Sequence, residues 1–164
     1  MRDVSADYAR SILHYDPGTG IFTWKVSRGR RCKSGQTAGT LCTAGYRQIR
    51  IDGVAILAHR LAWLFVHGEM PTPAIDHINR AKDDNRIENL RLATCSQNGA
   101  NRPRNTNNKS GFKGVWWRKD IRRWQAAIRV DGRLIHLGYF DDPIVANAAY
   151  LAAAKTNFKQ FASA

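Results

Sequence analysis

The spacing of apolar residues predicts one helix and three strands in the first third of the chain. Apolar and polar positions alternate in the strand-like runs, and Asp52-Gly53 is typical of a two-residue hairpin turn. Ser27–Gly39 is rich in glycine and arginine and contains no acidic residue, which indicates a basic loop. The predicted elements are a helix at Ser5–Tyr15, a turn at Asp16–Gly20, and strands at Ile21–Val26, Tyr46–Ile51 and Val54–Ala58.

The middle of the chain shows helical spacing and then a strand, loop, strand and helix pattern. Apolar residues recur three and four positions apart from Leu57 to Phe65, which predicts a helix at Ala58–His67. Thr94 and Gln97 have the spacing of a capping box, so another helix should begin at Cys95. Between the two helices we expect an extended segment at Ala74–Asn79, a polar loop at Arg80–Glu88 and a strand at Asn89–Ala93.

The last third of the chain predicts a small sheet and one long helix. Asn101–Ser110 has no large apolar residue and three cationic ones, which is typical of a linker. Asp131-Gly132 indicates a hairpin, and Asp142-Pro143 resembles a helix N-cap followed by proline at the first helical position. The predicted elements are strands at Phe112–Arg118, Trp124–Val130 and Leu134–Tyr139, and a helix at Ile144–Asn157.

These patterns predict an α+β fold with three parts. Residues 1–102 form the first domain, in which a β-rich segment precedes a strand–loop–strand–helix core at 58–102. Residues 103–110 form a basic linker. Residues 111–164 form a three-stranded antiparallel sheet packed on one helix.

The charge of the chain indicates a polyanionic partner. Lys and Arg number 26 against 13 Asp and Glu, which gives a formal net charge of +13. Counterion release favours binding of such a chain to nucleic acid. No long basic amphipathic helix supports a membrane-surface protein, and no apolar run predicts a signal peptide or a membrane span, so a cytoplasmic location is expected. Three cysteines without a C-x-x-C pair predict free thiols rather than a zinc site.

Three side chains in the middle region have the chemistry of a metal-assisted hydrolase. Asp76 and Asn98 offer a carboxylate and an amide oxygen, which are ligands for Mg²⁺ or a similar hard cation. His77 has a side chain suited to accept a proton from water at neutral pH. Neighbours on a regular strand point to opposite faces, so Asp76 and His77 can serve one phosphate only if the strand ends there. Taken singly, each of the three residues is more often a surface, turn or helix residue.

The same stretch resembles the HNH endonucleases with a ββα-metal fold, in the His-Asn-Asn subgroup known from phages and introns. The resemblance covers residues 59–102 and rests on His59-Arg60-Leu61, Asp76-His77, Asn89-Leu90-Arg91 and Gln97-Asn98. It implies that His77 is the general base and that Asp76 and Asn98 bind one Mg²⁺ or Mn²⁺. It also implies that Asn89 ties the loop and helps to orient the base. Many members have histidine at the position of Asn98. The amide oxygen of asparagine suits a cation that prefers oxygen ligands.

Residues 111–164 resemble the plant ethylene-response-factor (Apetala-two) DNA-binding domain, in which a three-stranded sheet enters the major groove. The resemblance rests on Gly111–Val115, Trp124–Arg129, Leu137–Phe140 and the alanine-rich helix. It implies, with strand alternation, that one face of the sheet contacts DNA. The residues expected on that face are Trp116, Arg118, Gln125, Arg129 and His136, with Lys113 nearby. Contacts to phosphate are expected from Arg91, Arg102, Arg104 and Lys109.

The sequence therefore predicts a metal-dependent endonuclease of phage type acting on double-stranded DNA. By resemblance it leaves 5′-phosphate and 3′-hydroxyl ends, as a nicking or homing enzyme in the cytoplasm of a bacterial host. One catalytic unit per chain predicts that a monomer nicks one strand, and no obligate protein partner is evident. The alternatives are a non-catalytic DNA-binding regulator and an RNA-binding protein.

Overall fold

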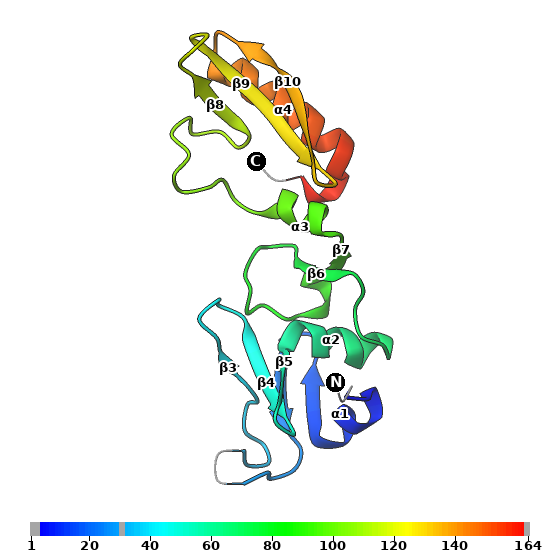
Figure 1. The fold of residues 1–164 in the computed structure, drawn as a ribbon. Coiled ribbons are helices and arrows are strands. Elements are labelled where there is room, and N and C mark those ends of the chain that lie inside the picture. Colours follow the sequence, from blue (N-terminus) through cyan, green and yellow to red (C-terminus); the bar gives the residue numbers. More distant parts are fainter. Residues whose placement is uncertain (1–3, 30–31, 163–164) are drawn as a thin grey trace. The chain divides into compact units, whose positions relative to one another are not determined.

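The computed structural model describes residues 4–29 and 32–162, and the chain divides into two compact units (Figure 1). One unit is Met1–Leu92 and the other is Ala93–Ala164. Each unit combines strands with helices, so the predicted α+β class is confirmed. The division falls just before the helix predicted to begin at Cys95, so that helix belongs to the C-terminal unit.

The N-terminal unit begins with a helix that is shorter than predicted. Helix α1 (Ala6–Ile12) is followed directly by strand β1 (Leu13–Asp16), which pairs antiparallel with β2 (Ile21–Trp24). The predicted helix at Ser5–Tyr15 was therefore wrong over its last turn. Leu13 and Tyr15 are buried on alternate positions of β1, and pairing with β2 outweighs the local helical preference.

A second sheet and a helix complete the core of this unit. The three-stranded sheet has the order β3 (Thr40–Leu41), β4 (Arg47–Ile51), β5 (Val54–Leu57), and it leads into α2 (Ala58–His67). The helix buries Leu61 and Leu64 at the spacing expected from the sequence. Residues from both sheets and from α2 share one hydrophobic core. The short β3 was not predicted.

A pair of short strands is packed on this core. Strand β6 (Ala74–His77) pairs with β7 (Leu90–Ala93), and a 3-10 turn at Ile87–Asn89 ends the loop between them. Ile75 and Leu90 are buried in the same core as α2 and β2. Because isolated two-stranded pairs are marginally stable in water, this contact with the core holds the β6–β7 pair in place.

The C-terminal unit is a sheet backed by a helix. Helix α3 (Cys95–Asn101) carries the predicted capping box between Thr94 and Gln97. The sheet has the order β10-β9-β8, all antiparallel, with β8 (Val115–Arg118), β9 (Arg123–Val130) and β10 (Arg133–Phe140). Helix α4 (Pro143–Phe158), followed by a 3-10 turn at Lys159–Phe161, covers one face of the sheet (Figure 1).

The face of this sheet that packs on α4 is apolar. Val115, Ala126 and Ala146 form a small buried cluster between the sheet and α4, and Ile128 packs with Tyr150 in a second one. Leu137 packs against both clusters, although a bulge displaces it from the pairing register. Ile135 is 42% exposed, because it lies on the edge strand β10.

Every helix in the described part of the chain is too short or too polar to cross a lipid bilayer.

The turn at Asp16–Gly20 supports the loop between β6 and β7. Gly20 has φ +73°, and a Cβ there would lie 2.5 Å from Arg86 N and 2.6 Å from the carbonyl carbon of Asn85. Ile87 N also donates to Pro17 O at 3.4 Å. The turn and the loop therefore meet backbone to backbone, which leaves no room for a side chain at position 20.

Gly20→Ala should destabilise the chain by about 2–4 kcal/mol, since it adds a backbone clash to the strain of a positive φ. Gly53→Ala is the matched control, because Gly53 has φ +82° but an added Cβ would meet nothing within 4 Å. It should cost about 1 kcal/mol. Urea unfolding of the full chain measures both values, and equal losses would show that the turn does not support the loop.

Candidate active site

Asp76 and His77 are the last two residues of β6 and both are buried. Asp76 is 4% exposed and His77 is 6% exposed. The strand ends at His77, and Arg80 has φ +65° three residues later, so the chain leaves its extended path immediately. Asp76 and His77 therefore lie at a strand end, which is the condition under which both side chains could serve one phosphate.

The Asp76 carboxylate is held by Arg91 on the neighbouring strand β7. Arg91 donates from Nε and Nη2 to Oδ2 of Asp76, at 2.9 and 2.7 Å. The two side chains are 4% and 14% exposed, so the pair is largely withdrawn from water. A buried carboxylate needs such a partner, because an uncompensated charge in the interior is costly. Arg91 thus fixes Asp76, while its expected contact with phosphate stays a prediction.

Asn89 closes the loop that follows His77. Its Oδ1 accepts from Asn79 N at 3.0 Å, and its Nδ2 donates to Asp84 O at 2.8 Å. Ile78 N donates to Asn89 O at 2.9 Å. One side chain therefore ties both arms of the loop together, next to the catalytic histidine expected from the sequence.

A second set of hydrogen bonds stiffens the same loop. Asp84 accepts from Asn79 Nδ2 at 2.6 Å and from the Arg86 guanidinium at 2.8 and 2.9 Å. These bonds, that of Arg86 above all, hold the pKa of Asp84 well below its usual range. Asn85 lies between these residues and is 1% exposed. The loop is polar in sequence but ordered in structure.

The His77 ring lies in a group of three rings. His59 on α2 meets it edge to face, with centroids 5.0 Å apart and planes at 88°. Tyr46 contacts both imidazoles, with centroids 5.3 Å from His59 and 5.8 Å from His77. Lys82 Nζ lies 5.1 Å from the centre of the Tyr46 ring. No pattern in the sequence pointed to Tyr46, because only the fold brings residues 46, 59 and 77 together.

The two imidazoles are kept neutral. Burial lowers the pKa of His59 to about 3, and His77 and Arg60 act in the same direction. Burial also lowers the pKa of His77, against the opposing effects of the Asn85 side chain and of nearby carboxylates such as Asp76. A cation on each ring would cost about 3 kcal/mol of repulsion at 5 Å and an effective dielectric constant of 20. A neutral His59 avoids that cost when His77 accepts a proton.

Asn98 lies on α3, in the C-terminal unit. Its proposed role as a metal ligand rests on the sequence motif. Within residues 4–29 and 32–162, no three His, Cys, Asp or Glu side chains converge as a metal cluster. A carboxylate with an amide oxygen needs no such cluster, because Mg²⁺ takes most of its ligands from water and phosphate.

The outer face of the C-terminal sheet gathers the residues expected to contact DNA. Arg118 Nη1 donates to Gln125 Oε1 at 3.0 Å, and Gln125 Nε2 lies 3.1 Å from His136 Nδ1. A hydrogen-bonded row therefore crosses β8, β9 and β10. Trp116 pairs with Gln125 on this face and is 38% exposed. Arg129 is exposed on the same face and donates to Gly132 O at 2.9 Å.

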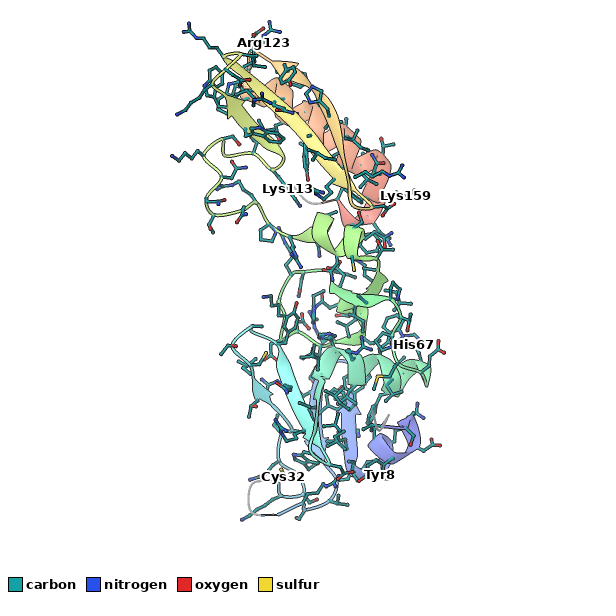
Figure 2. The ribbon with its side chains drawn as sticks, viewed as in Figure 1. Tyr8, Cys32, His67, Lys113, Arg123 and Lys159 are labelled. Atoms are coloured by element: carbon teal, nitrogen blue, oxygen red, sulfur yellow. The ribbon has the colours of Figure 1, made fainter. Side chains whose placement is uncertain are left out.

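The predicted linker falls within the C-terminal unit. Figure 2 labels Lys113, which donates from Nζ to the carbonyl oxygens of Ala100 and Arg102 at the end of α3. The last turn of α3 leaves carbonyl oxygens without intrahelical partners, and these accept from the lysine. The expected position of Lys113 beside DNA stays a prediction. The three cationic residues of the segment are exposed: Arg102, Arg104 and Lys109.

The middle region of the chain is similar to a family of known proteins. Residues 57–100 match the family model of the HNH endonucleases (HNH_3). The match includes Asp76, His77, Asn89 and Asn98 and supports a nuclease function for this part of the chain.

The chain is also similar to "Protein 3.8" of Escherichia phage T7, with 32% identity over 76 residues. These residues are 46% of this chain and 63% of the phage protein, so the chain spans less than two thirds of that relative. No solved structure matches the chain.

The burial of His59 predicts a pH-dependent stability. Its pKa falls from 6.5 in the unfolded chain to about 3 in the folded one, so the unfolded state binds the extra proton as the pH drops below 6.5. Stability should therefore fall by about 1.4 kcal/mol per pH unit, or about 2 kcal/mol between pH 7 and 5. His59→Phe should remove this part of the loss, and the part due to the lowered pKa of His77 should remain, as measured by urea unfolding at both pH values. His67→Phe, at an exposed histidine, should leave the whole loss, and an unchanged slope in His59→Phe would contradict the prediction.

Proposed function

We propose that this protein is a metal-dependent DNA endonuclease of the HNH type that hydrolyses phosphodiester bonds of double-stranded DNA. The observation that carries the proposal is the buried Asp76-His77 pair at the end of β6, inside a region that matches the HNH endonucleases. A buried carboxylate beside a buried imidazole is costly to maintain, and such groups gather at functional sites.

His77 acts as the general base in this proposal. Because burial lowers its pKa, the imidazole is neutral at pH 7 and one ring nitrogen can accept the proton of an attacking water. The water oxygen then bonds to phosphorus, the bond between phosphorus and the 3′ oxygen of the preceding nucleotide breaks, and that oxygen takes up a proton from solvent, which produces 5′-phosphate and 3′-hydroxyl ends. Asn89 is a positioning residue, because its amide holds the loop that begins beside His77.

Asp76 and Asn98 would hold one divalent cation. Their oxygen donors suit Mg²⁺ or Mn²⁺, which when bound stabilises the charge that develops on the phosphate and on the leaving oxygen. Arg91 holds Asp76 through Oδ2 and keeps the carboxylate at the end of the strand. Phosphate contact by Arg91 is part of the same proposal.

The C-terminal sheet would bind the DNA. Its outer face carries Arg118, Gln125 and His136 in one hydrogen-bonded row with Trp116 and Arg129 beside it, which suits a major groove. The fold of one sheet backed by one helix agrees with the resemblance to the ethylene-response-factor domain. Arg102, Arg104, Lys109 and the nearby Lys113 would add charge along the phosphate backbone.

The similarity to a protein of phage T7 supports a phage-type enzyme working in the cytoplasm of a bacterial host. A single site per chain predicts nicking by the monomer, and site-directed or homing cleavage belongs to the same proposal.

The full chain should relax supercoiled plasmid in Mg²⁺ and should leave it intact in EDTA. His77→Ala should reduce the rate by at least about 100-fold, since general-base catalysis contributes roughly 10²–10⁴. Gel electrophoresis of the plasmid over time measures the rate and separates nicks from double-strand breaks.

His14→Ala is the matched control, because His14 is exposed on β1, and it should cleave at the wild-type rate. Tight DNA binding without cleavage by the wild-type chain would favour a regulator. Stronger competition by structured RNA than by duplex DNA, at one stated salt concentration, would favour an RNA-binding protein.

Arg129→Ala in the His77→Ala background should weaken duplex binding by about 10–100-fold, the range of a lost arginine–base contact. Lys155→Ala is the control, because Lys155 is exposed on α4 in the layer behind the sheet, and it should bind almost normally. Fluorescence anisotropy with labelled duplex DNA measures both affinities. An equal loss in both variants would mean that general charge, and not the sheet face, binds the DNA.

A further inference from the structure

Asn85 presents a buried amide oxygen that the loop itself does not use. The residue is 1% exposed and lies in the loop between β6 and β7. Its Nδ2 donates to Asp83 O at 3.0 Å, which fixes which end of the amide is oxygen. Among the residues that the structure describes, no donor satisfies hydrogen-bond geometry at Asn85 Oδ1. Buried polar atoms in this state are rare and call for an explanation.

The backbone of Asn85 is held from the other side. Tyr15 Oη donates to Asn85 O at 2.8 Å in a buried contact, and the backbone of Gly20 lies against the Asn85 carbonyl carbon. Burial raises the pKa of Tyr15 to about 12, so this hydroxyl remains a donor at neutral pH. The N-terminal strands therefore set the position of the amide, although they carry no residue of the motif.

The Asn85 side chain is close enough to the His77 ring to raise the pKa of His77, as a nearby hydrogen-bond acceptor does. The rings of His59 and Tyr46 contact the same imidazole and limit its rotation. A neutral imidazole carries a proton on one ring nitrogen and a lone pair on the other. When an acceptor holds the N–H, the other nitrogen is therefore the one that can accept a proton.

We propose that Asn85 is a positioning residue that accepts a hydrogen bond from one ring N–H of His77 and thereby fixes its tautomer. The other ring nitrogen then carries the lone pair that accepts the proton of water. This inference rests on the proposed function for its consequence in catalysis, but the tautomer itself is independent of cleavage. The rings of His59 and Tyr46 lie against the same imidazole.

The tautomer can be read from long-range ¹⁵N–¹H spectra of the full chain labelled at histidine, without metal or DNA. In the wild type, His77 should show one tautomer and a ring N–H that exchanges slowly with water. That proton should give a nuclear Overhauser effect to the side-chain amide of Asn85. Two averaged tautomers at His77 in the wild type would overturn the proposal, and so would a contact from Asn85 to His59 alone.

Variants separate hydrogen bonding from support of the loop. Asn85→Leu keeps the volume but removes the acceptor, so His77 should become a mixture of tautomers. Asn85→Asp keeps an acceptor and should preserve the single tautomer. Tyr15→Phe removes the hydrogen bond to the Asn85 backbone, and it should lower stability while leaving the tautomer of His77 unchanged. Equal effects of Tyr15→Phe and Asn85→Leu on the tautomer would mean that Asn85 acts only as support.

Cleavage provides the second readout. Asn85→Leu should lower kcat by about 10–100-fold, the range for partners that orient a functional histidine, with unchanged affinity for DNA. Asn85→Asp should recover most of that loss. If the wild type cleaves nothing, the proposed function fails while the spectra still decide the role of Asn85. If the wild type cleaves and Asn85→Leu keeps both its rate and one tautomer, the inference about Asn85 is wrong.

Discussion

The ion pair between Asp76 and Arg91 is the contact on which the site depends. Both side chains are withdrawn from water, and a single carboxylate oxygen receives both bonds from the guanidinium. Such a pair gains little net stability over an apolar one, but each partner becomes costly if the other is absent. The pair joins β6 to β7 and so fixes the strand end at which His77 lies. Arg91 is therefore part of the structure of the site, whichever further contact it makes with a substrate.

The N-terminal unit acts as the support of a short motif. The β6–β7 pair is too small to fold on its own, and Ile75 and Leu90 attach it to the larger core. Tyr15 and Gly20 meet the loop on one side, and His59 meets the His77 ring on another. Tyr15, Gly20 and Tyr46 lie outside the matched residues 57–100, so residues from elsewhere in the chain help to hold the loop and the His77 ring.

Local rules were enough to predict most elements but not their partners. Helix α2, the cap at Thr94 and the hairpin at Asp131-Gly132 are set by residues close in sequence, and the structure has all three. The end of α1 was predicted wrongly because the strand at Leu13 depends on pairing with β2. Asp76 and His77 were recognised from their motif, whereas the partner of Asp76 and the ring contacts of His77 depend on tertiary packing that no spacing reveals.

The contact of Lys113 with the end of α3 changes how residues 102–113 should be regarded. A flexible tether must lose conformational freedom when its cations meet a polyanion, and that loss weakens binding. Here the segment is a closed loop whose ends are already joined, with Asn108 and Ser110 bonded inside it. Most of that conformational entropy is already lost during folding. Arg104 and Lys109 are therefore held on a folded loop rather than on a flexible segment.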